Sequence, residues 1–238
     1  MKRFLLCSVI IVFSTSLGLA QPQATAPADH HAHAVAPAPS ADKIWAELMA
    51  GNKRFVAGKT HAYAVVPLRR KLTSGQQPHV IVLSCSDSRV PPELVFDQSL
   101  GDLFVVRTAG NIADLVGLGS IEYAVDHFHS PLLVVLGHSK CGAVTAACSG
   151  DKMPTPNLEA IVDKIDPAVI QAKTYAKSDD LIEAAIKENV RQSAKDLLAN
   201  SPIIREAVTS GKLKIVEAEY RLDTGEVSRL DATASPHN

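Results

Sequence analysis

The sequence predicts an α/β fold, a mostly parallel central β-sheet flanked by helices, with an antiparallel edge strand or C-terminal hairpin. Three short runs rich in Val, Ile and Leu, at 79–84, 102–108 and 131–137, are typical of strands buried on both faces. A segment with apolar residues at helical spacing, 118–128, separates the last two runs. Buried strands alternating with helices indicate a parallel sheet.

Serine caps indicate two further helices. Ser40 precedes a segment with apolar residues at helical spacing, and Ser178 precedes an amphipathic segment over 179–200. Near the end of the chain, 212–221 alternates in polarity and turns through Asp-Thr-Gly into 226–230. That pattern predicts a hairpin, which supplies the antiparallel edge.

Composition and charge exclude some classes of protein. The chain has 238 residues, 46% of them hydrophobic, and 24 Lys and Arg against 25 Asp and Glu, a net charge of -1. This usage rules out a wholly disordered chain. A nucleic-acid partner is not expected either, because such binding needs a basic surface.

The N-terminal part differs from the rest of the chain. Residues 1–20 have a positive start, an uncharged apolar run and small residues at the end, which indicates a signal peptide and a periplasmic or secreted protein. A membrane anchor is the alternative, but the apolar run is short for a bilayer span, and no stable membrane insertion is expected after cleavage. Residues 21–40, rich in Ala, Pro and His, are predicted to be a disordered leader. The folded domain is then 41–238.

The predicted strands end in residues that can bind a metal. Ligands of such sheets collect beyond the carboxyl ends of the strands, where Cys85 follows the first strand and His138 the third, with Cys141 three residues later. Two thiolates and an imidazole can supply three ligands to Zn²⁺ and leave a fourth position open, as in catalytic zinc sites. Buried cysteines that only pack, or a disulfide between Cys85 and Cys141, remain alternatives, with Cys148 left over.

A carboxylate follows the first cysteine at short range. Asp87 lies two residues after Cys85, and Arg89 can hold it in bidentate fashion, ionised and oriented. Beside a metal, such a carboxylate can accept a hydrogen bond from bound water. The alternative is an ordinary Asp–Arg pair that stabilises a turn.

Three motifs together resemble a known family. C-S-D-S-R-V-P-P-E at 85–93, R-T-A-G-N at 107–111 and G-H-S-K-C-G-A-V at 137–144 resemble the β-class carbonic anhydrases, and the resemblance runs from about Trp45 to Leu230. It implies zinc-dependent, reversible hydration of carbon dioxide to bicarbonate and a proton, by attack of zinc-bound hydroxide. It also implies a homodimer or homotetramer with active sites at the subunit interface.

The resemblance assigns roles to individual residues. Cys85, His138 and Cys141 would bind one Zn²⁺ per subunit, and Asp87 and Arg89 would form the catalytic dyad.

Five further positions match substrate contacts of the family. Gln76 would hydrogen-bond the substrate across the dimer interface, and the backbone N–H of Gly142 would help to hold bicarbonate. The small apolar pocket for carbon dioxide would be lined by Phe104, Ala109 and Tyr123.

Other interpretations stay open at this point. Some members of the family have a Trp three residues before the first cysteine as part of an inhibitory bicarbonate site; this chain has Val82, so no such site is expected. The chain could be a non-catalytic zinc-binding protein on the same fold. It could also be a zinc hydrolase of another small heterocumulene such as carbon disulfide. A thiol-redox protein is less consistent, because no C-x-x-C motif is present. The leader histidines His30, His31 and His33 could bind metal or be incidental. His79, His127 and His129 are candidates for the proton exit by residue type alone.

Overall fold

The computed structural model describes residues 39–230. The predicted signal peptide 1–20 and nearly all of the leader 21–40 lie outside the described residues, as do residues 231–238 of the predicted domain. Cys85, Cys141 and Cys148 are free thiols in the described part of the chain, so the Cys85–Cys141 disulfide considered above is not formed.

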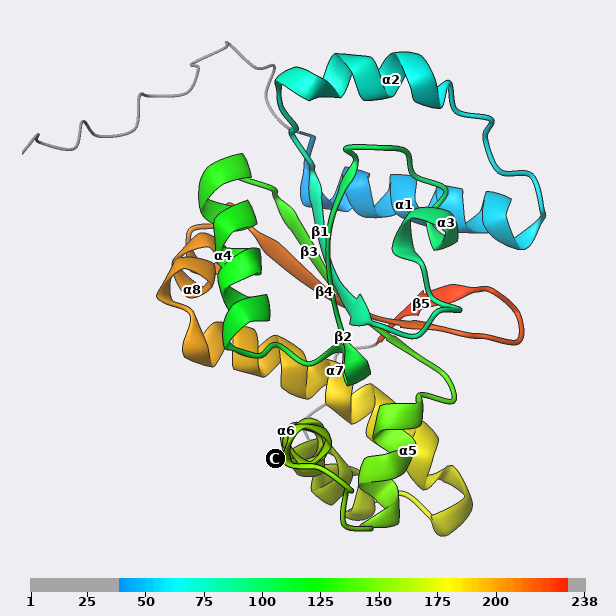
Figure 1. Cartoon of the computed structure of the whole chain (residues 1–238), viewed down its shortest axis with the longest axis vertical. Helices are drawn as coiled ribbons and strands as arrows, with labels where there is room; N and C mark the ends of the chain where they lie inside the picture. The colour runs from blue at the N-terminus through cyan, green and yellow to red at the C-terminus, as the bar shows by residue number, and fades with distance from the viewer. Residues whose placement is uncertain (1–38, 231–238) are drawn as a thin grey trace, which may run out of the picture. The chain divides into compact units, whose positions relative to one another are not determined.

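A sheet of five strands, in the order β2-β1-β3-β4-β5, forms the centre of the described domain (Figure 1). Three of its pairings are parallel, and β4 with β5 is antiparallel, so the predicted fold class is confirmed. The strands are β1 (Val80–Cys85), β2 (Leu103–Thr108), β3 (Leu132–His138), β4 (Lys214–Tyr220) and β5 (Val227–Arg229).

Helices occupy most of the remaining chain. The α-helices are α1 (Ala41–Val56), α2 (Val65–Lys71), α3 (Pro92–Val95), α4 (Leu115–Phe128), α5 (Gly142–Ser149), α6 (Pro156–Lys173), α7 (Leu181–Asn200) and α8 (Pro202–Thr209). Short 3₁₀ turns are η1 (Leu72–Ser74), η2 (Ala109–Asn111) and η3 (Ser178–Asp180). None of the helices within residues 39–230 combines the length and apolar character needed to cross a membrane.

The sheet is covered on both faces, which explains the continuous apolar runs of its central strands. Every residue of β1 and β3 is buried. Ile44 and Leu48 of α1 pack on one face, whereas α4, α7 and α8 pack on the other. Figure 1 shows α1 and α4 on opposite sides of the strands. Burying apolar side chains on both faces stabilises β1 and β3 as the rigid centre of the domain.

A third apolar cluster lies beyond the carboxyl ends of the strands. It joins α5, α6 and the first half of α7, with Ile165 and Ile186 fully or almost fully buried. Cys85 and Cys141 belong to this cluster. The ends of β1 and β3 are therefore enclosed by helices.

Local hydrogen bonds explain where the predicted helices differ from the observed ones. Ser40 caps α1 as predicted, its Oγ accepting from the N–H of Lys43 at 3.4 Å. The Asp114 side chain accepts from the N–H of Gly117 at 2.7 Å, so α4 begins three residues earlier than the predicted 118–128. Ser178 opens a 3₁₀ turn instead of capping the helix, and α7 begins only at Leu181.

Candidate metal centre

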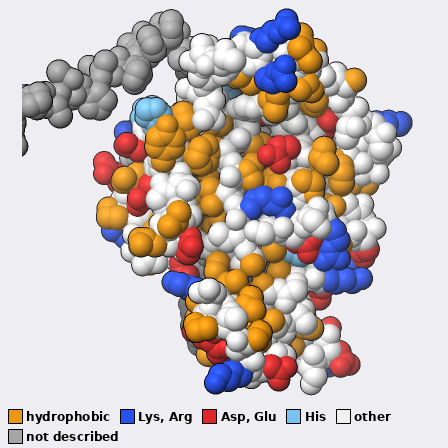
Figure 2. All heavy atoms as spheres, in the orientation of Figure 1, with side chains coloured by type: hydrophobic (Ala, Val, Ile, Leu, Met, Phe, Trp, Pro, Cys, Tyr) orange, Lys and Arg blue, Asp and Glu red, His pale blue; other side chains and the backbone are white. Residues whose placement is uncertain are grey.

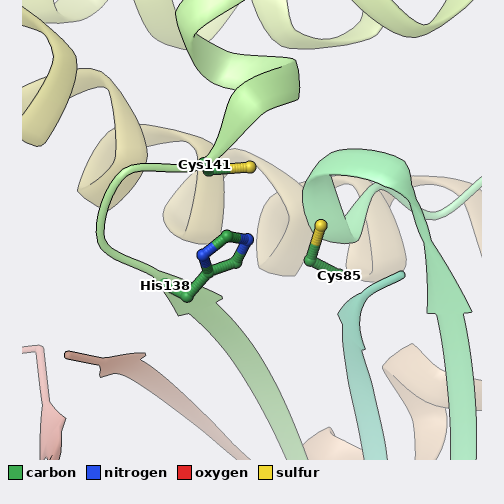
Figure 3. A group of neighbouring side chains, drawn as sticks. All are labelled: Cys85, His138 and Cys141. Carbon is green, nitrogen blue, oxygen red and sulfur yellow. The ribbon is translucent and has the colours of Figure 1, made fainter. Parts of the chain in front are cut away.

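Two neighbouring strands and one helix start bring the predicted ligands together. Cys85 ends β1, His138 ends β3, and Cys141 is the residue that precedes α5. Their ligand atoms all lie within 4.8 Å of one another. In Figure 3 the two sulfurs and the imidazole ring converge on one point. The structure thus confirms the clustering that was predicted from strand ends.

The turn between His138 and Cys141 is held in a defined shape. Lys140 has a φ of 56°, a left-handed conformation that turns the chain back towards the cluster. Ser139 anchors the turn to the C-terminal hairpin: its N–H donates to the Tyr220 carbonyl at 2.9 Å, and its Oγ accepts from the N–H of Leu222 at 2.9 Å. These bonds fix the spacing between the two ligands that flank the turn.

The imidazole of His138 is oriented for metal binding. Its Nδ1 lies 3.0 Å from the Ser139 carbonyl, which can only accept, so Nδ1 carries the proton. The opposite nitrogen, Nε2, is buried and has no hydrogen-bond partner in the described chain. A buried polar atom without a partner is costly, and a metal ion shared with two thiols would satisfy it. The residues present therefore fit a zinc ion.

Charge in the cluster concentrates on Cys85. The neighbouring Cys141 thiol lowers the pKa of Cys85, and the negative Cys85 sulfur in turn raises the pKa of Cys141. The N–H of Gly110 also donates to the Cys85 sulfur, at 3.3 Å. Burial alone would lower the pKa of His138, but the adjacent Cys85 thiolate outweighs it and raises that pKa. A negative sulfur beside an imidazole is the electrostatic setting that a divalent cation needs.

The predicted dyad is formed and faces the cluster. Asp87 Oδ1 accepts from the Arg89 N–H and Nε, both at 2.9 Å, and Oδ2 accepts from Nη2 at 2.7 Å. The Arg89 hydrogen bonds hold the pKa of Asp87 well below its usual range, so the carboxylate is ionised at neutral pH. Asp87 Oδ2 lies 3.9 Å from His138 Nε2, at the unpartnered side of the imidazole.

Arg107 has a role that its place in a motif did not reveal. From β2 its Nε donates to the Cys85 carbonyl at 2.9 Å, and its Nη2 donates to the Asp87 carbonyl at 2.5 Å. One guanidinium therefore fixes the backbone of a ligand and of the dyad. The signal available in the sequence was a lone arginine inside an apolar strand.

The predicted substrate residues fall into two groups. Ala109 follows β2 directly before Gly110, and Gly142 opens α5 beside Cys141, so both border the cluster. Phe104 pairs with Ile81 in the sheet, four residues before Cys85, which places it about 13 Å from that end of the sheet. Tyr123 packs near Phe104 with ring centroids 6.3 Å apart.

Gln76 is exposed in the segment before β1. Within one chain Gln76, Phe104 and Tyr123 are thus not brought to the ligands, and their contact with substrate stays a prediction. Tyr123 also stacks on His127, with ring centroids 4.9 Å apart.

The Cys–His–Cys cluster and the Asp–Arg dyad lie at the strand ends of a mostly parallel sheet. This combination of fold and site is typical of one class of metalloenzymes. The family model described as carbonic anhydrase matches residues 80–227. The chain belongs to the carbonic anhydrase family and, by its fold and structural relatives, to the β class. It is therefore an enzyme of the lyase type, and the family's reaction is the hydration of carbon dioxide.

Individual relatives agree with this assignment. Carbonic anhydrase 2 of Mycobacterium tuberculosis is 41% identical over 185 residues, 76% of this chain and 88% of the relative. The carbonic anhydrase of Mycolicibacterium smegmatis is 40% identical over 188 residues, 77% and 90% of the two chains. Among solved structures, a tetrameric β-carbonic anhydrase of Sordaria macrospora superimposes with a TM-score of 0.63 at 25% identity, covering 80% of this chain and 98% of the other. The Coccomyxa β-carbonic anhydrase gives 0.62 at 27% identity, covering 80% and 83%.

Proposed function

We propose that this carbonic anhydrase interconverts carbon dioxide and bicarbonate with one Zn²⁺ per subunit, bound by Cys85, His138 and Cys141. The observation that carries the proposal is the unpartnered Nε2 of His138, enclosed by two thiols and 3.9 Å from the Asp87 carboxylate. When bound, zinc would lower the pKa of water so that hydroxide is available near neutral pH.

The dyad supplies a hydrogen-bond acceptor for the attacking oxygen. Arg89 donates two hydrogen bonds to Asp87 Oδ1 and one to Oδ2, and together they fix the plane of the carboxylate. A carboxylate oxygen has two lone pairs, so Oδ2 can still accept a hydrogen bond from the oxygen that attacks carbon dioxide. Asp87 thereby orients the remaining lone pair of that oxygen towards the substrate carbon.

Two small residues make room for the substrate. A Cβ on Gly142 would meet no atom within 4 Å, so open space lies at the start of α5. The first N–H groups of a helix lack intrahelical partners, and the N–H of Gly142 can donate to a bicarbonate oxygen there. Ala109, which follows β2 directly before Gly110, offers an apolar methyl group suited to carbon dioxide.

A homodimer or homotetramer is part of the proposal. Leu115 and Val116 at the start of α4 are 87% and 75% exposed, and Tyr123 on the same helix is 50% exposed. Figure 2 shows apolar side chains gathered over α4. Exposed apolar patches favour protein interfaces. A second copy seated on this face would cover them and would let Phe104 and Tyr123 of one chain line the site of another.

Export to the periplasm or the medium also belongs to the proposal, and it is supported by the signal pattern of residues 1–20 alone. N-terminal sequencing of the protein recovered from the periplasm tests it. We expect a mature chain that begins near residue 21, and a full-length cytoplasmic chain would contradict the proposal.

The zinc mechanism is tested by three variants compared with the wild type. Cys85→Ser should lose both stoichiometric zinc and carbon dioxide hydration, because serine is a poor zinc ligand. Asp87→Ala should keep its zinc and lose most of its activity at neutral pH. Cys148→Ser is the matched control, since Cys148 lies in α5 outside the cluster.

Metal analysis and stopped-flow hydration measure both properties. Full zinc content in Cys85→Ser would show that the ligand assignment is wrong. Unchanged activity in Asp87→Ala would remove the dyad from the mechanism, and loss of zinc in Cys148→Ser would mean that the three-ligand set is incomplete.

A further inference from the structure

A buried asparagine on α7 contacts the metal centre through one intermediate. Asn189 is 1% exposed, and its Nδ2 donates to the Gly110 carbonyl at 2.7 Å. The N–H of the same glycine donates to the Cys85 sulfur at 3.3 Å. Two consecutive hydrogen bonds therefore run from the helix to the ligand sulfur.

Gly110 needs such support because of its conformation. Its φ of 71° lies in the left-handed region, and it sits in the short turn η2 that follows β2. Glycine has the widest backbone freedom of any residue, so its peptide groups stay in place only where neighbours hold them. Here Cys85 engages the peptide group before its Cα and Asn189 the one after it.

The helix approaches the ligand-bearing strand closely enough for this contact. A Cβ on Gly137, the residue before His138, would lie 2.4 Å from the Val190 side chain. The glycine thus permits α7 to lie against the end of β3, which carries the neighbouring Asn189 towards η2. The bond to Gly110 is the one hydrogen bond that the Asn189 side chain makes among the described residues, and its Oδ1 is buried without a partner.

We infer that Asn189 is a positioning residue of the metal centre, which fixes Gly110 so that its N–H remains directed at the Cys85 sulfur. The inference rests on the proposed zinc function. Hydrogen bonds to a ligand sulfur stabilise its negative charge and its orientation. Loss of Asn189 releases the Gly110 peptide groups, and the sulfur then binds its metal in a less defined geometry.

The test compares zinc release from Asn189→Leu and from the wild type. Leucine keeps the branching of asparagine at Cγ but has no donor. In a second variant, Asn189→Ser, the hydroxyl can satisfy itself on the backbone carbonyl one turn earlier, at a small cost to the helix, and it is too short to replace Nδ2. Removing a hydrogen bond made directly to a metal ligand typically lowers metal affinity about 10- to 100-fold. Asn189 acts one residue further out, through Gly110. We expect both variants to transfer zinc to a chromophoric chelator faster, by a factor towards the lower end of that range.

Asn52→Leu is the matched control. Asn52 is also a buried asparagine, 2% exposed, that donates to backbone carbonyls, those of Val95 and Gly225 at 3.0 and 2.8 Å. It touches none of the residues of the metal centre. This variant should lose global stability as Asn189→Leu does, while its zinc release stays at the wild-type rate.

A spectroscopic readout separates positioning from general destabilisation. In protein loaded with Co²⁺, the sulfur-to-metal charge-transfer band should move to longer wavelength in both Asn189 variants, because the sulfur loses its hydrogen bond, and should not move in Asn52→Leu.

The inference is overturned if both Asn189 variants release zinc at the wild-type rate, or if Asn52→Leu accelerates release equally. An unchanged cobalt band in the Asn189 variants overturns it as well. Wild-type protein that binds no zinc would instead refute the proposed function.

Discussion

Replacing Gly110 by alanine should destabilise the protein through two effects that can be measured separately. The first is backbone strain, since an L-residue in the left-handed region costs about 1–2 kcal/mol and Gly110 has a φ of 71°. The second is steric, because the new Cβ would lie 2.7 Å from Ile165 Cδ1 and 3.3 Å from Ala143 Cβ. Ile165 is fully buried. Such overpacking typically costs about 1–3 kcal/mol, so the total is about 2–5 kcal/mol.

Gly150→Ala isolates the strain. Gly150 has a φ of 69°, nearly the same as Gly110, but a Cβ there would meet nothing within 4 Å. Its substitution should therefore cost only about 1–2 kcal/mol. The difference between the two alanine variants is the steric contribution.

The double variant Gly110→Ala/Ile165→Val tests the steric contribution directly. Valine removes the Cδ1 methyl that the new Cβ would strike, at a cost of about 0.5–1.5 kcal/mol when made alone. We expect the double variant to be more stable than the sum of the single changes by about 1–2 kcal/mol, within the range for residues in contact.

Urea unfolding at one fixed zinc concentration gives the free energy of unfolding of each variant. Two results would refute the reasoning: equal losses for Gly110→Ala and Gly150→Ala, or strict additivity in the double variant. Either would mean that Ile165 moves aside without cost.

Two further predictions concern a buried carboxyl and the apolar face of α4. Burial raises the pKa of Glu219, which faces Lys187, Glu183 and Arg221. As the pH rises, the unfolded chain therefore loses this proton before the folded chain does. Stability should fall between a pH of about 4.5 and the pKa of Glu219 in the folded protein. Glu219→Gln removes that titration and should raise the free energy of unfolding more at pH 7 than at pH 4, by about 1.4 kcal/mol for each unit of pKa shift; equal gains at both pH values would contradict the sign. Leu115→Glu should shift the light-scattering mass towards the monomer, because a charge would be buried in the proposed interface; an unchanged oligomer would place the interface elsewhere.

Strands were more predictable than helices in this chain. A strand buried on both faces is a continuous apolar run, so β1 and β3 were found to within about one residue. The helix α6 was not predicted, because Pro167 stands in its interior. Proline costs a helix about 3 kcal/mol, and α6 persists because residues such as Ile165 and Val169 bury their side chains against its neighbours.

The metal ligands could be predicted from the sequence, but the residues that hold them in position could not. Cys85 and His138 end adjacent parallel strands, and the rule that strand ends share one edge of the sheet brings them together. Asn189 lies 79 residues from Gly110, on a helix whose polar residues otherwise resemble a solvated face. The hydrogen bond from Asn189 to Gly110 forms only because α7 packs against Gly137. No local sequence pattern predicts it.

The two strands that carry Cys85 and His138 are hydrogen-bonded neighbours in the centre of the sheet. Core packing, and not the metal, therefore sets the separation of these ligands, in contrast to small domains in which metal binding supplies the folding energy. Under the proposed zinc function, the metal would bind to an already folded chain and would add to its stability by mass action. With the proposed export, such a chain would fold first and acquire its metal afterwards. The zinc supply of the receiving compartment would then decide how much of the enzyme is active.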